Sequence, residues 1–274
     1  MIKDILIGSD PEFFIFKEDI PESSIGLIKG TKRRPEEVAP GYGILKDNVL
    51  IEGNIPPAES KEEFVSNIKQ LKTFMSELIG PHSLVCADSA KFTDQQLNNF
   101  EARQFGCAPY FNAWTLNTNS PKNLANLNWR VAGFHIHLGY TYDGSISSDY
   151  MAMYITRAFD YFVVYPSRQI FDDPIRAKYY GDFGNFRIKP YGVECRSLGG
   201  YFCNDEYLDW VYEQSMKAIE FCNNPENIEK LEKVQSPEID TEKNYEILNI
   251  KLEEQVYGNI ANNQPGILAP KKTV

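Results

Sequence analysis

Apolar and polar residues alternate strictly over the stretch Phe134–Tyr140. The apolar residues of this stretch fall on one side, and His135 and His137 fall on the other. Strict alternation predicts a β-strand with one apolar face and one face that carries chemistry. The chain has only three histidines, so two of them share this predicted face.

Three further apolar stretches each place two polar residues at positions i and i+2. They are residues 4–16, 49–55 and 192–198, and the pairs are Asp10 with Glu12, Glu52 with Asn54, and Glu194 with Arg196. Each pair projects from one side of its strand. If the four strands share a sheet, one face carries four acids, two imidazoles and a guanidinium group. Such a face is not a hydrophobic core, because unpaired buried charge is too costly.

Pro11 lies between the two acids of the first strand. Because proline has no N–H to donate to a sheet, it predicts a sheet edge or a bulge at this point. Residues 20–46, rich in proline and glycine, predict an irregular or hairpin region. We interpret the basic triplet Lys32-Arg33-Arg34 within it as a solvated loop. Loops are also expected over residues 115–129 and 172–190.

Apolar residues at helical spacing predict helices over 61–80, 149–163 and 205–222, with charged helices near 224–234 and 240–257. Ser60 followed by Glu63 is a capping box at the start of the first helix. Strands and helices that do not alternate strictly indicate an α+β fold with a mainly antiparallel sheet. No linker divides the chain, so we expect one domain over 1–274, with a helical C-terminal part over 204–274.

Composition narrows the function classes. Hydrophobic residues make up 42% of the 274 residues, which is ample for a core, and the net charge of −10 disfavours a nucleic-acid partner. No run approaches the roughly 20 apolar residues of a membrane helix. The N-terminus enters a strand pattern directly, which predicts a cytoplasmic protein without a signal peptide. The five scattered cysteines indicate reduced thiols that serve in packing.

The polar pairs suggest metal and phosphate chemistry. Carboxylates such as Asp10, Glu12 and Glu52 are ligands for hard cations, and imidazole serves as ligand or catalyst. A dinuclear zinc hydrolase is an alternative that needs more imidazoles, and only His82 remains.

Glu194 and Arg196 form either a plain ion pair or, with Arg187 and Lys189 just before them, a phosphate site. Neither a Walker-A loop nor Gly-x-Gly-x-x-Gly occurs, so a nucleotide would be held by cations and side chains.

The order of these motifs resembles that of the carboxylate–amine ligases of the glutamine synthetase and glutamate–cysteine ligase superfamily. The likeness covers roughly residues 6 to 203 and is greatest to the phage-encoded group called COOH–NH2 ligase type 2. Residues 105–109 and 130–139 carry it most directly. Two departures concern the substrate: Tyr110 follows Pro109 where the ligases often have Pro-Asp, and Phe134 replaces the second glycine of Gly-Gly-His.

The resemblance implies a curved antiparallel sheet like the glutamine synthetase catalytic domain, with helices on its convex face. Two or three divalent cations would lie on the concave face, between ATP and the acid substrate. The implied metal ligands are Asp10, Glu12, Glu52, His135 and Glu194. The nucleotide phosphates would contact His137, Arg187 and Arg196, to which the sequence adds Lys189, and the implied catalytic residues are Arg187, Glu194 and Arg196.

The implied activity is ATP-dependent formation of an amide or peptide-like bond through an acyl phosphate, with small-molecule or peptide carboxylates and amines as substrates. Mg²⁺ is the expected cation, with Mn²⁺ as the alternative because histidine is a less usual ligand for Mg²⁺. An ATP-dependent phosphotransferase of the same fold and a catalytically silent module that binds nucleotide or metal stay open as alternatives. If the chain is phage-encoded, the expected compartment is the host cytoplasm.

Overall fold

The computed structural model describes residues 1–103, 110–119, 127–252 and 256 of the chain. The segment 105–109, which carries part of the family resemblance, lies outside these residues, and so do Cys107 and the end of the predicted helix near 240–257. Four cysteines of the described part are free thiols, namely Cys86, Cys195, Cys203 and Cys222. Within the described residues, no helix has the length and apolarity needed to cross a membrane.

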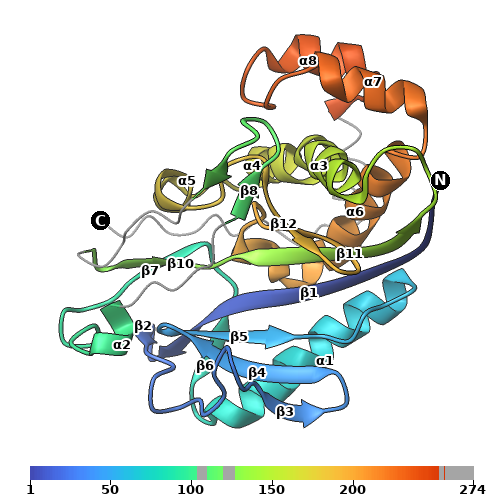
Figure 1. Ribbon diagram of the computed structural model, residues 1–274. Coiled ribbons are helices and arrows are strands. Elements are labelled where there is room, and N and C mark those ends of the chain that lie inside the picture. The colour runs from blue at the N-terminus through green and yellow to red at the C-terminus, as the bar shows by residue number, and fades with distance from the viewer. Residues whose placement is uncertain (104–109, 120–126, 253–255, 257–274) are drawn as a thin grey trace.

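A large sheet organises the molecule around two long neighbouring strands, β1 (Ile2–Lys17) and β11 (Phe134–Tyr142) (Figure 1). Beyond β11 follow β13 (Gly192–Cys195), β12 (Asn185–Lys189), β8 (Tyr110–Asn112) and β9 (Thr118–Asn119). On the other side of β1 follow β5 (Leu50–Asn54), β4 (Tyr42–Asp47) and β3 (Glu36–Ala39), while β2 (Ile20–Glu22) and β6 (Ser83–Val85) pair with the far end of β1.

Within the described residues, the pairings between these strands are antiparallel, which confirms the predicted mainly antiparallel sheet of the α+β class. A separate two-stranded sheet joins β7 (Ser89–Lys91) to β10 (Trp129–Val131). The predicted irregular or hairpin region contains the β3–β4 hairpin, and the turn after Asp47 leads directly into β5.

The prediction of a sheet edge or bulge at Pro11 is wrong. Pro11 lies inside the sheet opposite Phe134, and the register shift between β1 and β11 falls between Lys3 and Leu6. On its other side, β1 pairs with β5 only from Glu12 onward. Ile55, the residue after β5, donates a 3.2 Å hydrogen bond to the carbonyl of Ser9, so the missing N–H of the proline falls in a gap of this ladder between Ser9 and Glu12.

The predicted loop over 172–190 also needs correction. It contains the short helix α5 (Pro174–Tyr179) and the strand β12, which forms a hairpin with β13. The glycines at 181 and 184 signal turns, and both adopt positive φ. The five residues of β12 alternate strictly between polar and apolar, which is itself a strand signal, so a loop that extends to residue 190 overlooks this pattern.

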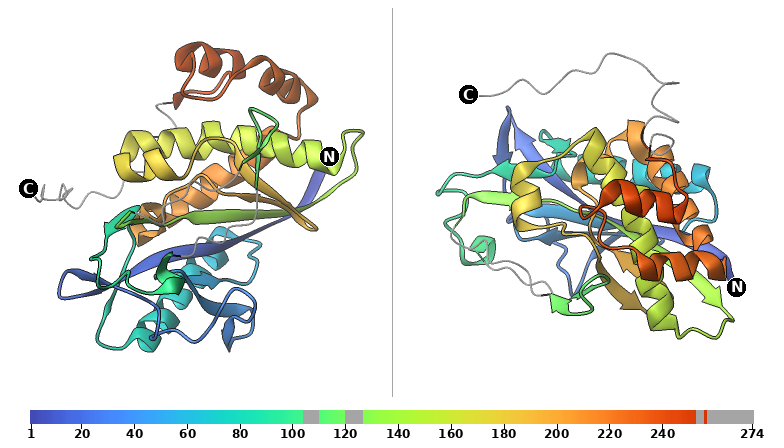
Figure 2. Two further views of the ribbon diagram at one scale, coloured as in Figure 1. Left: turned by 60° about the vertical axis from the view of Figure 1, so that its left-hand side comes forward. Right: turned by 90° about the horizontal axis from the view of Figure 1, so that it is seen from above.

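The helices α1 (Lys61–Ile79), α3 (Ser148–Phe159) and α6 (Leu208–Phe221) pack on the apolar face of the sheet (Figures 1 and 2). Phe64 of α1 stacks on Phe134 of β11 and contacts Tyr212 of α6. The helices α7 (Pro225–Lys233) and α8 (Thr241–Leu248) lie on the outer side of α3 (Figure 1).

Shorter helical segments complete the described chain: α2 (Phe100–Arg103), the π-helical turn η1 (Asp160–Val164), α4 (Tyr165–Ile170), and the 3₁₀ turns η2 (Gly200–Cys203) and η3 (Asp205–Tyr207).

The two sides of β1 have different surroundings. Ile7, Phe13 and Ile15 belong to the main apolar cluster under the helices. Asp10 and Glu12 project from the opposite side, as the i, i+2 spacing predicts. Beyond Glu12, Phe14 closes this side with a second apolar cluster that includes residues from β5 and β7. The polar face of the sheet is thus bounded at one end by an apolar wall.

Candidate functional site

The strand registers bring the four predicted polar pairs onto one face of the sheet. Asp10 is paired with His135, Glu12 with Glu52, His137 with Glu194, and Glu194 with Arg187. Because residues directly opposite each other in a sheet project to the same side, these side chains form a band that crosses β5, β1, β11, β13 and β12. The third histidine, His82, lies at the end of α1, where its ring contacts the carbonyl of Ile79. It does not join the band, so the zinc hydrolase alternative gains no ligand.

Asp10 lies at the centre of the band, between the two imidazoles. Its Oδ1 atom is 3.1 Å from Nδ1 of His135 and 3.2 Å from Nε2 of His137. Burial raises the pKa of Asp10, but the two neighbouring imidazoles outweigh it and hold the pKa well below its usual value. The carboxylate of Asp10 is therefore ionised and directed at both rings.

Two tyrosines orient the imidazoles. The hydroxyl of Tyr191 is 2.6 Å from Nδ1 of His137, and the two rings stack with an angle of 17° between their planes. The hydroxyl of Tyr180 is 3.3 Å from Nε2 of His135 and accepts a 2.6 Å hydrogen bond from Arg196. Contacts at the second ring nitrogen are the usual means by which proteins orient a histidine that binds or reacts at the first.

Glu194 is fully buried and gathers three cations. Lys189 lies 2.7 Å from its Oε2, Arg187 lies 3.4 Å from its Oε1, and Arg196 forms a close ion pair with the same Oε1. Burial raises the pKa of Glu194, but Arg196 is the main cause that lowers it, to about 2. Three cations around one carboxylate leave a local surplus of positive charge, which suits an anion such as phosphate.

A second acidic group lies farther along the band. Ligand oxygens of Glu12, Asp47 and Glu52 lie within 4.8 Å of one another. Burial raises the pKa of Glu12, and burial together with the charges of Asp10, Asp47 and Glu12 raises the pKa of Glu52 well above its usual value. One oxygen of Glu12 accepts a 2.7 Å hydrogen bond from the backbone of Gly133. Several carboxylates this close repel one another unless a cation lies among them.

The pattern of polar pairs does not include Asp47, because we interpret Asp47-Asn48 as a turn ahead of the strand over 49–55. That interpretation is correct for the backbone, since Asn48 adopts a φ of 58°. The hairpin then pairs Asp47 with Leu50. Leu50 precedes Glu52 by two residues and lies on the same face of the sheet, so Asp47 and Glu52 share that face. The signal for this third carboxylate is its place directly before the predicted turn, because a tight hairpin there brings the last residue of one strand close to the first residues of the next.

Lys32 was also missed. The triplet 32–34 is exposed, as the interpretation of a solvated loop requires. However, the Lys32 ammonium lies 2.5 Å from Oδ2 of Asp47. Partial desolvation of the ammonium group lowers the pKa of Lys32, but the charges of Asp47 and Glu52 outweigh it and raise the pKa above its usual value. One residue of the triplet therefore belongs to the electrostatics of the acidic group.

The donor atoms on this face fit divalent cations. Besides Glu12, Asp47 and Glu52, the residues Asp10, His137 and Glu194 offer ligand atoms within 4.8 Å of one another. Ligands of an octahedral Mg²⁺ or Mn²⁺ at about 2.1 Å lie roughly 3 to 4.2 Å apart, which these groups can reach with small side-chain movements. The histidine of this second group is His137, whereas the resemblance implies His135 as the metal ligand.

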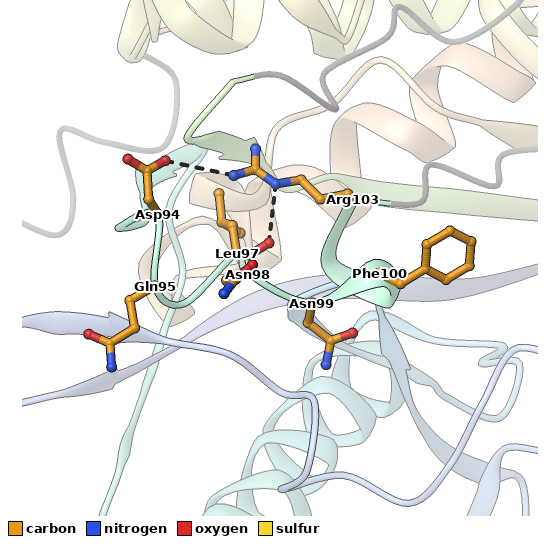
Figure 3. A pocket seen from close by; sticks show the side chains of 7 residues that line it. All are labelled: Asp94, Gln95, Leu97, Asn98, Asn99, Phe100 and Arg103. Atoms are coloured by element: carbon orange, nitrogen blue, oxygen red, sulfur yellow. Dashed lines mark hydrogen bonds and ion pairs between the residues drawn. The ribbon is translucent and has the colours of Figure 1, made fainter.

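A surface hollow lies apart from this face. Residues of the segment 94–103 line it, and Figure 3 shows Arg103 within it, paired with Asp94 at 3.7 Å and bonded to the carbonyl of Leu97 at 3.1 Å. Its floor is built from one short segment with an exposed Phe100 and contains none of the predicted site residues.

Comparison of the sequence with models of known protein families and with curated proteins gives no match. Among solved structures, the chain is similar to one described as a GmaS/ADP complex, with 12% identity and a TM-score of 0.38. The similarity covers 93% of this chain and 65% of that one. The chain thus spans less than two thirds of the length of the structure it matches, and a likeness this distant adds nothing to the geometry described above.

Proposed function

We propose that the protein is an ATP-dependent carboxylate–amine ligase that forms an amide or peptide-like bond through an acyl phosphate. One observation carries the proposal. A single sheet face holds an acidic group at one end, a cation-rich group at the other, and Asp10 with two imidazoles between them. This is the distribution that a metal–nucleotide complex requires, because its cations need carboxylates and its phosphates need guanidinium and ammonium groups.

Two sets of side chains would hold Mg²⁺ or Mn²⁺. The first set is Asp10, Glu194 and one or both of His135 and His137, and the second is Glu12, Asp47 and Glu52. When bound, the cations supply positive charge to the phosphate oxygens. The resemblance of the motifs to the phage-encoded type 2 ligases supports the same assignment of metal ligands. By the same resemblance, the polar face would be concave, and the chain would form one catalytic domain that acts in the cytoplasm.

The cations around Glu194 would act on the phosphoryl group. Its transfer spreads negative charge over the phosphate oxygens, and preorganised donors stabilise this charge more than they stabilise the ground state. Arg196 and Arg187 offer planar guanidinium groups that match phosphate in fork geometry, and Lys189 adds a point charge. Glu194 holds all three in place before the nucleotide arrives, so little reorganisation is needed.

The proposed reaction has two steps. An oxygen of the acid substrate attacks the γ-phosphorus, the bond to the β,γ-bridging oxygen breaks, and ADP leaves. The nitrogen of the amine substrate attacks the acyl carbon, phosphate leaves with the electrons of the C–O bond, and the amine gives up a proton. The products per turnover are one amide, one ADP and one phosphate.

The test is an assay for ADP and free phosphate with ATP, Mg²⁺ and mixtures of acids and amines. Arg196→Ala should lower turnover by about 100-fold or more, the range seen when one stabilising donor is removed. Glu194→Gln should also lower turnover, because it removes the carboxylate that holds the three cations in place. Arg33→Ala removes an equal charge from the exposed turn and should retain full activity. Circular dichroism checks that each variant is folded.

Full turnover in both site variants contradicts the assignment of these residues. ADP without stoichiometric phosphate would instead indicate a phosphotransferase, and ATP binding without any ADP would indicate a silent binding module. Each of these outcomes overturns the ligase proposal.

A further inference from the structure

A positively charged side chain, that of Lys32, lies beside one of the two proposed metal-binding groups. The Lys32 ammonium contacts Asp47, and the charges of Glu52 and Glu12 also act on it. A protonated amine offers three hydrogen-bond donors and one positive charge. One positive charge neutralises only part of the negative charge of three neighbouring carboxylates. Lys32 therefore occupies, in a weaker form, the role that a divalent cation has in the proposed function.

The backbone explains why Lys32 lies there. Thr31 and Arg34 exchange two backbone hydrogen bonds of 3.0 and 2.9 Å, which makes a tight turn with Lys32 and Arg33 at its tip. The carbonyl of Gly30 accepts a 3.0 Å hydrogen bond from the backbone of Lys46 in β4. A side chain at Gly30 would collide with the carbonyl of Ile44, so only glycine allows the turn to approach β4 so closely.

The same geometry allows the Lys32 side chain to move away from the acidic group. The backbone of the turn is anchored through Gly30 and not through the lysine. The Lys32 side chain is 44% exposed and ends a flexible four-carbon stem. Its ammonium group can exchange Asp47 for water without moving β4 or the acidic residues.

We propose that Lys32 is a displaceable counter-ion of the Glu12–Asp47–Glu52 group, which it partly neutralises until a divalent cation binds and releases it into solvent. This inference rests on the cation-binding part of the proposed function and not on the ligase reaction. The group of Asp10, His137 and Glu194 lies outside the contacts of Lys32. The two groups should therefore load with different affinities, and Lys32 lowers the affinity of one of them.

Removing the lysine should raise cation affinity at its own group. If the lysine occupies the acids nine-tenths of the time, the apparent affinity is lowered about tenfold, because only the unoccupied fraction binds. The probe is Mn²⁺ alone, titrated into the full chain, with free Mn²⁺ measured by electron paramagnetic resonance. Lys32→Met should tighten one class of sites about tenfold and leave the other class unchanged.

Arg33→Met is the matched control. It removes the same charge from the same turn, but Arg33 is exposed at the tip of the turn, so its affinity should stay within about twofold of the wild type. A second readout uses the wild-type protein. Acetylation of Lys32, followed by mass spectrometry, should become several-fold faster when Mn²⁺ saturates the protein, because the ammonium group is released from Asp47.

Unchanged or weaker Mn²⁺ binding in Lys32→Met, or the same acetylation rate with and without Mn²⁺, overturns the inference, and so does the absence of Mn²⁺ binding in both proteins. These readouts need neither ATP nor turnover. Tighter binding and faster acetylation in a protein that makes no ADP would uphold the role of Lys32 and reject the ligase. Turnover combined with unchanged Mn²⁺ binding would do the reverse.

Discussion

Asp160 is a completely buried acid away from the polar face. Its Oδ2 atom accepts a 2.7 Å hydrogen bond from the indole of Trp114, and it begins the π-helical turn η1. Burial raises the pKa of Asp160 to about 8, in spite of the hydrogen bond from Trp114, which lowers it. The folded protein therefore keeps a proton that the unfolded chain loses above pH 4. The resulting stability is fully present below about pH 4 and is lost as the pH rises to about 8.

Asp160→Asn should remove this pH dependence. An asparagine can still accept the indole hydrogen bond and does not titrate. Between pH 6 and 7 the free energy of unfolding of the wild type should fall by about 1.4 kcal/mol more than that of the variant, the value for one proton per pH unit. Urea unfolding at intervals from pH 5 to 8 measures both slopes. Parallel curves would mean that Asp160 is already ionised in the folded protein.

At the scale of single elements, α1 shows how a local signal determines a helix start. The Ser60 hydroxyl accepts a 3.2 Å hydrogen bond from the backbone of Glu63, as the capping box predicts. The carboxylate of Glu63 accepts its 2.8 Å hydrogen bond from the backbone of Glu59, one residue earlier than the motif requires. The helix then packs Phe64, Ile68 and other apolar residues against the sheet.

Ser60→Ala should lower the free energy of unfolding by about 1 kcal/mol, the usual cost of losing an N-cap oxygen. Ser66→Ala is the control. It lies in the same helix and is exposed, so the change should be neutral or slightly stabilising because alanine has the higher helix propensity. Chemical denaturation of both variants gives the comparison. Equal effects would show that the Ser60 hydroxyl contributes nothing specific.

At the scale of the whole molecule, the acidic face couples cation binding to stability. Glu12 and Glu52 have raised pKa values, so the protein without cations keeps carboxyl protons above the usual value of 4.5, and stability falls as the pH rises through the raised values. A divalent cation displaces those protons and, like them, relieves the repulsion between the carboxylates. Stabilisation by the cation should therefore be larger at pH 8 than at pH 5.

With Mn²⁺ at about 100 times its dissociation constant, the expected gain is about 2.7 kcal/mol, or a rise in Tm of roughly 5 to 10 °C at pH 8. At pH 5 the rise should be clearly smaller. Thermal unfolding with Mn²⁺ or EDTA at both pH values provides the measurement, with NaCl at equal ionic strength as the control for screening. The double variant Glu12→Gln, Glu52→Gln should lose much of the gain, and a rise equal at both pH values would contradict the role of these acids.

The sequence by itself determined the strands that carry the polar pairs, the longer helices, and the direction of the polar side chains on those strands. Strand parity is local, because side chains alternate along one strand whatever its neighbours are. The pairs at 10 and 12, 52 and 54, and 194 and 196 were therefore found without knowledge of the sheet. The helix caps and apolar stripes are local in the same sense, and the structure places α1, α3 and α6 where their patterns predict.

Only the tertiary structure decided which groups meet. Register between distant strands puts Asp10 opposite His135 and Glu194 opposite both His137 and Arg187, and nothing within a single segment specifies it. Asp47 and Lys32 join the acids through a turn and a hairpin whose local patterns describe only backbone geometry. The strand β12 pairs with both β13 and β8, and the alternation of its own five residues does not specify which strands those are. Contacts between segments far apart in the chain depend on the packing of the whole sheet, and a periodic pattern within one segment does not contain that information.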